Sequence, residues 1–140
     1  HGQRTAVLDM IDSYPMLEKW VRTFRITDAH TVVIEDEIKA DHAVEITYPL
    51  HMLSKPADCH AIESALPPLV LSVTRHGRQL IVTPQKDCFA SLTLCDRFDV
   101  ALNEGEPEQF HVRMPDQYHA YYTTEKKSEH HLRVVYRVFG

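Results

Sequence analysis

Apolar and polar residues alternate along most of this chain, which is the pattern of strands that bury one face. The clearest case is residues 44–53, where every second residue from Val44 to Met52 is apolar or aromatic. The same period of two places neighbouring side chains on opposite faces of a sheet. The pattern predicts ten short strands, at residues 6–10, 19–26, 31–38, 44–53, 69–75, 79–84, 89–95, 110–114, 118–123 and 131–139.

Turn signals separate these strands. The dipeptide His76-Gly77 before Arg78 predicts a short hairpin, because glycine adopts positive φ without strain. Residues 27–30 and 39–42 are expected to be further turns, and residues 54–68, with three prolines, a long connection. Only residues 57–65 suggest a short helix. The expected fold class is all-β, an antiparallel two-sheet β-sandwich of about ten short strands, with residues 1–140 as one domain.

The composition excludes two classes of binding partner, nucleic acids and membranes. The formal net charge is −5, so the chain lacks the basic footprint of a nucleic-acid-binding protein. The longest mostly apolar stretch, residues 66–73, is far shorter than the roughly 20 residues that span a bilayer, so no membrane partner is expected. The three cysteines, Cys59, Cys88 and Cys95, contain no CxxC pair and predict neither a disulfide framework nor a zinc knuckle. A Cys88–Cys95 bridge stays open.

No catalytic set is visible in the residues alone. The ten histidines are scattered, without HxH or HExxH spacing, and no GxSxG or glycine-rich phosphate loop occurs. Tyr118, Tyr121 and Tyr122 suggest either an aromatic platform for a sugar or ordinary core residues, and the core is the commoner role for aromatic residues in strands. The residues themselves therefore predict a β domain with no catalytic residue.

Four short stretches occur in an informative order: residues 8–15 (LDMIDSYP), 20–24 (WVRTF), 33–36 (VIED) and 50–52 (LHM). This order resembles the C-terminal β-sandwich domain of the heparinase II/III-like polysaccharide lyases. In that family an Asp-containing strand ends in Ala-Tyr or Ser-Tyr, a W-x-R strand follows, and a strand ending in Asp leads to one ending in Leu-His. The motif resemblance covers roughly the first 55 residues and the strand pattern covers the rest.

The resemblance implies a role within a larger enzyme. Members join an N-terminal α/α toroid to this sandwich and cleave uronic-acid-containing polysaccharides by β-elimination. The principal Tyr and a His-Asn motif of the family would precede His1. The resemblance therefore implies that this chain is a C-terminal fragment and is catalytically incomplete. It would form one wall of the substrate cleft, beside a helical toroid in cis. The start at His1, without Met or a signal sequence, is likewise expected of a processed or excised piece. The implied parent is periplasmic or secreted.

The resemblance also implies a metal site and two structural residues. Some members bind a metal through an upstream His, the Asp of the first strand and the His of the Leu-His strand, which correspond here to Asp9 and His51. Zinc is the expected ion, with the third ligand upstream of this chain. Trp20 is expected in the core between the sheets, and Arg22 is expected to pair with an acid such as Glu35 or Asp36.

Two other functions remain open at this stage. One is a stand-alone carbohydrate-binding or adhesion module, for which exposed tyrosines on one flat face would be the sign. The other is a small jelly-roll enzyme with a metal in its barrel, which needs three or four converging ligands. The scattered histidines argue against that second alternative.

Overall fold

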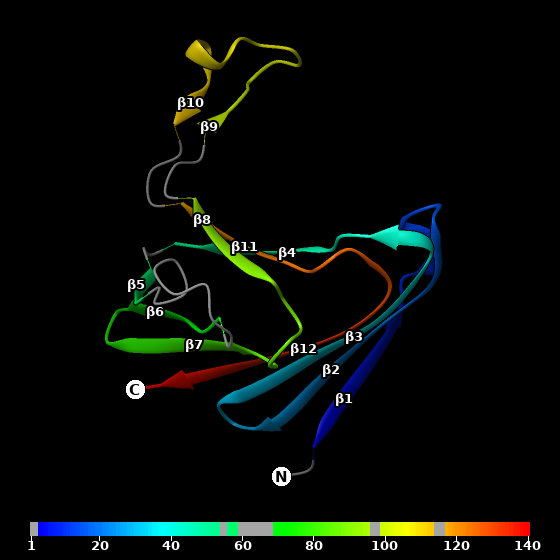
Figure 1. The fold of residues 1–140 in the computed structure, drawn as a ribbon. Helices are drawn as coiled ribbons and strands as arrows, with labels where there is room; N and C mark the ends of the chain where they lie inside the picture. Colours follow the sequence, from blue (N-terminus) through cyan, green and yellow to red (C-terminus); the bar gives the residue numbers. More distant parts are fainter. Residues whose placement is uncertain (1–2, 54–55, 59–68, 96–98, 114–116) are drawn as a thin grey trace.

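Two antiparallel sheets of unequal size face each other in the computed structural model, which describes residues 3–53, 56–58, 69–95, 99–113 and 117–140 (Figure 1). The larger sheet has the strand order β1 (Arg4–Asp9), β2 (Leu17–Asp28), β3 (Thr31–Val44), β12 (Lys127–Phe139), β7 (Arg78–Pro84), β6 (Leu71–Arg75), β5 (Pro56–Asp58). The smaller sheet has the order β4 (Thr47–Met52), β11 (Tyr118–Thr123), β8 (Ser91–Cys95). The predicted all-β sandwich is confirmed.

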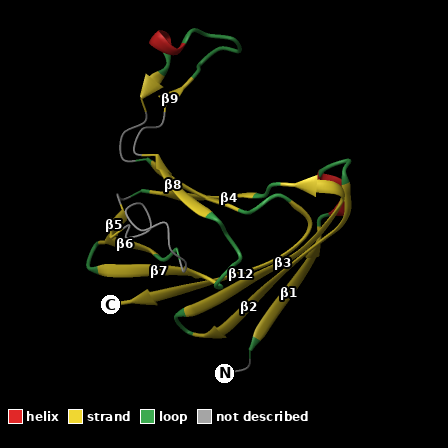
Figure 2. Cartoon of the chain, in the orientation of Figure 1, coloured by secondary structure: helices red, strands yellow, loops and turns green. Residues whose placement is uncertain are grey.

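Strands dominate the described residues, and the two short 3-10 turns are η1 (Ile11–Ser13) and η2 (Glu108–Phe110) (Figure 2). None of the helical turns in the described part of the chain has the length and apolar character needed to cross a membrane. The suggested helix at residues 57–65 falls mostly outside the described residues, and its first two positions belong to β5.

The predicted turn at residues 39–42 is wrong, because β3 runs through it to Val44. Lys39 pairs with Lys19 across the sheet, and Ala40 pairs with Leu17 and is buried. Residues 39–42 are mostly polar, but Ala40 faces inward, as the two-residue period of a strand requires. The chain leaves the larger sheet only after Val44 and enters the smaller one at β4, so the predicted strand 44–53 is divided between two sheets.

The core lies between the two sheets. The larger sheet and the residue leading into it contribute Leu69, Leu71, Val82, Leu132 and Val134, and the smaller sheet contributes Tyr48, Leu92, Ala120 and Tyr122. Tyr122 is fully buried and its hydroxyl donates to the Leu69 carbonyl oxygen at 2.7 Å. Burial of apolar surface of this kind stabilises the fold at roughly 25 cal/mol per Å².

The short hairpin predicted between β6 and β7 is present, and its turn has two residues because Arg78 already belongs to β7. His76 has φ 50° and Gly77 has φ 74°, and Arg75 and Arg78 form the last pair of the ladder. Positive φ at both central residues is the type I′ arrangement, which matches the twist of the flanking strands. The sequence signal at Gly77 is therefore confirmed.

A two-stranded ribbon projects from the connection between β8 and β11 (Figure 1). Its strands, β9 (Asp99–Val100) and β10 (Val112–Arg113), pair only with each other. Leu102 and Phe110 within the ribbon are exposed. The predicted strand at residues 110–114 is thus only a short pair at the base of this ribbon.

Candidate functional site

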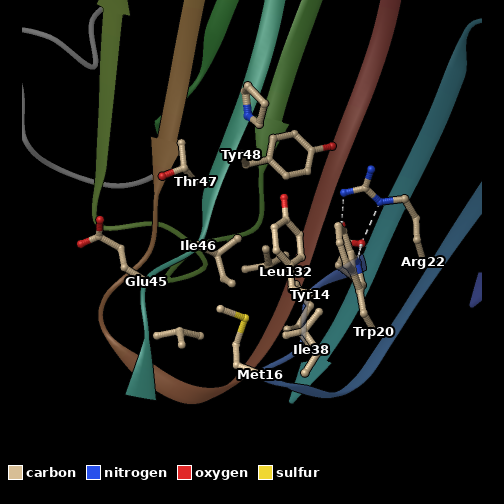
Figure 3. Close-up of a pocket in the computed structure, with 14 residues that line it drawn as sticks. Tyr14, Met16, Trp20, Arg22, Ile38, Glu45, Ile46, Thr47, Tyr48 and Leu132 are labelled. Atoms are coloured by element: carbon tan, nitrogen blue, oxygen red, sulfur yellow. Dashed lines mark hydrogen bonds and ion pairs between the residues drawn. The ribbon is translucent and has the colours of Figure 1, made fainter. Parts of the chain in front are cut away.

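A pocket of about 540 Å³ opens between the sheets where β3 passes into β4 (Figure 3). One side is formed by the η1–β2 connection, β2, β3 and β12, and the other by the β3–β4 connection and the start of β4. The lining residues are Tyr14, Met16, Leu17, Trp20, Arg22, Asp36, Ile38, Val44, Glu45, Ile46, Thr47, Tyr48, Pro49 and Leu132. Most of this surface is apolar, as is usual for small-molecule sites in proteins.

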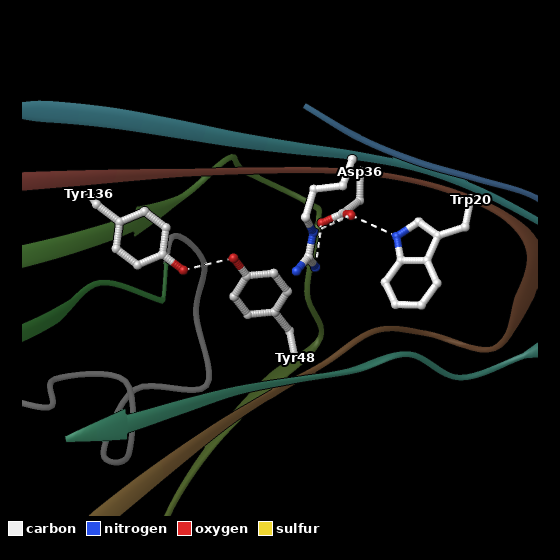
Figure 4. Close-up of polar contacts among 5 residues, drawn as sticks. Trp20, Asp36, Tyr48 and Tyr136 are labelled. Atoms are coloured by element: carbon white, nitrogen blue, oxygen red, sulfur yellow. Dashed lines mark hydrogen bonds and ion pairs between the residues drawn. The ribbon is translucent and has the colours of Figure 1, made fainter. Parts of the chain in front are cut away.

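A buried carboxylate organises the polar end of the pocket (Figure 4). Asp36 is fully buried, and its Oδ1 accepts the Trp20 Nε1–H at 2.8 Å and the Arg22 Nε–H at 2.7 Å. Its Oδ2 accepts the Arg22 Nη2–H at 3.0 Å. The β2–β3 register places Arg22 directly opposite Asp36, so the pair is built into the ladder. The expected pairing of Arg22 with an acid is confirmed, with Asp36 as its partner.

Aromatic rings enclose the Arg22 guanidinium. Its Cζ lies 5.6 Å from the ring centroids of both Trp20 and Tyr48, and the Tyr14 ring stacks on Trp20 at 6.1 Å. Burial disfavours the charged guanidinium, but the hydrogen bonds and negative charge of Asp36 outweigh it and raise the pKa of Arg22. Arg22 is therefore a permanent cation that is stabilised by one carboxylate and two ring faces.

Two phenols continue this network. The Tyr48 and Tyr136 hydroxyls lie 2.7 Å apart (Figure 4). Burial raises the pKa of Tyr48, and burial together with the neighbouring Tyr48 raises the pKa of Tyr136. Both phenols therefore stay protonated at neutral pH, so neither can act as a base there. In the protonated form each phenol can donate a hydrogen bond or a proton.

The two predicted metal ligands lie on different sheets. Asp9 is exposed at the end of β1, and its Oδ1 accepts the Ile11 N–H at 3.1 Å. His51 is exposed on β4, where its ring stacks on His119 with a centroid distance of 4.1 Å. The described part of the chain contains no group of three or more His, Cys, Asp or Glu side chains placed to hold a metal. By themselves Asp9 and His51 do not make a site, and zinc binding with an upstream ligand stays a prediction.

His119 is a second buried polar group that sequence reasoning missed. It lies opposite His51 on β4 and Cys95 on β8, and its Nδ1 lies 2.9 Å from the Tyr121 hydroxyl. Only 4% of its surface is exposed. Burial, and secondarily the nearby His51, lower the pKa of His119. No local motif marks this residue, because its surroundings come from strands that are distant in the sequence.

The lowered pKa of His119 predicts acid sensitivity. The unfolded chain takes up a proton on this imidazole near pH 6.5, whereas the folded chain resists protonation, so stability is present above that pH and falls as the pH drops below it. We expect a loss of up to about 1.4 kcal/mol per pH unit from this group. Urea unfolding at pH 7.5 and 5.5 measures it, and His119→Gln should flatten the dependence.

His131→Gln, which replaces an exposed imidazole, is the matched control. It should keep the pH dependence of the unmodified chain. An unchanged pH dependence in the His119→Gln protein would contradict the assignment.

The suggested tyrosine platform is wrong. Tyr122 is fully buried in the core, and the Tyr121 hydroxyl meets His119. Adjacent residues of β11 point to opposite faces, so Tyr121 and Tyr122 cannot share one flat surface. The alternative reading of these tyrosines as core residues is confirmed for Tyr122.

Cys88 is buried and carries a free thiol, whose S–H donates to the His131 carbonyl oxygen at 3.5 Å. Its side chain is not bridged to Cys95. Cys59 lies outside the described residues. The open Cys88–Cys95 bridge does not form.

Comparison with known proteins finds similarity in structure alone. No family model and no curated protein sequence matches the chain. The crystal structure of heparan sulfate lyase HepC from Pedobacter heparinus matches 99% of this chain at 14% identity with a TM-score of 0.65. The structure of a heparinase III gene product with methylated lysines matches 99% of this chain at 13% identity with a TM-score of 0.55.

The matched lyases are much longer than this chain. The match covers 20% of the heparan sulfate lyase and 19% of the heparinase III, so the chain spans about a fifth of their length. The resemblance implied by the motifs in residues 8–52 is thereby confirmed for the fold. The chain has the β-sandwich fold of a domain found in the heparan sulfate lyases.

Proposed function

We propose that these residues are the β-sandwich domain of a heparinase II/III-like polysaccharide lyase, catalytically incomplete alone, which supports one wall of the substrate cleft. The observation that carries the proposal is the fold match, which covers nearly the whole chain and only a fifth of a heparan sulfate lyase. The substrate would be a uronic-acid-containing polysaccharide. The rest of the enzyme, including a helical toroid in cis, would lie outside these residues.

The chemistry of β-elimination supports this division. A base must remove the proton from C5 of the uronate, and an acid must protonate the leaving glycosidic oxygen as the C4–O bond breaks and a C4–C5 double bond forms. In the pocket described above, Tyr48 and Tyr136 have raised pKa values and Arg22 is held by Asp36. A protonated phenol cannot take the C5 proton, so the base would come from elsewhere in the parent.

The proposal predicts a large difference in activity between the isolated chain and its parent. The whole protein that contains these residues is expected to release unsaturated uronic acid from heparan sulfate, measured by ultraviolet absorbance, whereas the 140 residues alone release none. A variant of the parent that lacks these residues shows whether the domain is needed. The proposal fails if the parent releases no unsaturated product from any uronate polymer tested, or if the isolated chain does so unaided.

A further inference from the structure

The tip of the β6–β7 hairpin concentrates positive charge at some cost to the fold. Arg75 and Arg78 are directly opposite each other at the end of the ladder, and both are exposed. Opposed residues on neighbouring strands share a face with Cβ atoms about 4.5–5.5 Å apart, and like charges in that arrangement are destabilising. His76, between them, has a φ of 50°, which is uncommon for a residue other than glycine.

No ion pair among the described residues reaches this tip, although the C-terminal Gly140 lies against Gly77 and Arg78. The arginine and lysine ion pairs join Arg22 to Asp36, Arg25 and Arg133 to Glu35, Lys19 to Glu37 and Lys39 to Glu18. The chain is acidic overall, with a formal net charge of −5. Arg75 and Arg78 therefore face each other as two cations without an ion pair to any described residue.

The turn also fixes how one guanidinium points. The Arg75 Nε–H donates to His76 Nε2 at 3.3 Å. This contact occupies the Nε–H of Arg75 and leaves its two terminal nitrogens to a ligand. A planar guanidinium pairs two N–H groups with two oxygens of one anion, and both carboxylate and sulfate fit this fork.

We propose that the β6–β7 tip, made of Arg75, His76 and Arg78, binds the anionic groups of an acidic polysaccharide. The ligand class is a polymer that carries carboxylate or sulfate on neighbouring sugars, so that the two guanidinium groups hold one group or two adjacent ones. This assignment rests on the proposed function, because the parent enzyme would supply the polysaccharide. The two like charges that destabilise the hairpin become favourable once the anion lies between them.

The test uses the whole protein that contains these residues and heparan sulfate as the probe, with the dissociation constant measured at several salt concentrations. Arg75→Ser/Arg78→Ser removes the two exposed ion pairs that these residues would form with the polysaccharide. It should weaken binding about tenfold at low salt and reduce the salt dependence of binding. The charge-keeping variant Arg75→Lys/Arg78→Lys should lose less. Lys19→Ser/Lys39→Ser is the matched control, because it removes the same charge from cations already paired with Glu37 and Glu18.

A second arm uses an unsulfated uronate polymer. Weaker binding of both polymers by the arginine variant assigns carboxylate, and weaker binding of heparan sulfate alone assigns sulfate; either supports the site. Unchanged affinity in the arginine variant, or an equal loss in the lysine control, overturns it. If the parent binds heparan sulfate through the hairpin but forms no unsaturated product, only the lyase proposal is refuted. If the parent cleaves heparan sulfate and the arginine variant binds it as tightly as the unmodified protein, only the hairpin site is refuted.

Discussion

Replacing Asp36 by alanine is expected to lower the free energy of unfolding by about 3–5 kcal/mol. The carboxylate is fully buried and accepts hydrogen bonds from Trp20 and from two nitrogens of Arg22. Its removal leaves a partly buried guanidinium without a counter-charge and the indole N–H without an acceptor, and a buried charge stripped of its partner is among the costliest single changes. Urea denaturation followed by circular dichroism measures the loss.

Glu37→Ala is the matched control for that experiment. Glu37 is the next acid on the same strand, but it pairs with Lys19 at the surface. Solvent screens such a pair, so its loss should change stability far less. A loss in Asp36→Ala no larger than that of Glu37→Ala would contradict the importance assigned to the Asp36 network.

Truncation of Tyr122 to alanine is expected to cost about 3–5 kcal/mol, because the ring fills the core between the sheets. Tyr122 is fully buried, and the ring centroid of Phe89 lies 5.1 Å away. Tyr122→Phe keeps the ring and removes only the hydroxyl that donates to the Leu69 carbonyl oxygen at 2.7 Å. That variant should lose about 1 kcal/mol. Thermal and urea unfolding of both variants separate packing from hydrogen bonding.

Tyr14→Phe serves as the control for the hydroxyl effect. The Tyr14 side chain is exposed, so water can solvate its hydroxyl in the folded chain as well as in the unfolded chain. Its loss should leave the unfolding midpoint unchanged within error. If Tyr122→Phe were as stable as the unmodified chain, the buried hydrogen bond to Leu69 would not contribute to the free energy of unfolding.

The strands were predictable because their signal is local. The alternation in residues 118–123 marks β11 with the observed bounds, and the His76-Gly77 turn follows from the few residues that accept positive φ. The end of β3 was misplaced because a polar run resembles a turn even when Ala40 within it is buried. Period-two reasoning identifies faces reliably and strand ends poorly.

The site was less accessible to sequence reasoning. The Arg22–Asp36 pair could be anticipated, because the two strands form a hairpin and the motif places both residues within it. The contact between Tyr48 and Tyr136 could not, since it depends on how β4 and β12 are placed by the packing of two sheets. His51 and His119 are likewise joined only by the β4–β11 register. Such pairings are properties of tertiary structure and leave no spacing pattern in the sequence.

The strand order has a consequence for how the chain folds. β12, the last strand in the sequence, lies in the middle of the larger sheet between β3 and β7 (Figure 1). As the ribosome releases the chain, β2 and β3 can pair early, but β6 and β7 have no partner that joins them to β3 until β12 appears. Pairing between segments so distant in sequence is slow, and unpaired edges invite association in the meantime. The larger sheet can therefore be completed only after β12 has been synthesised.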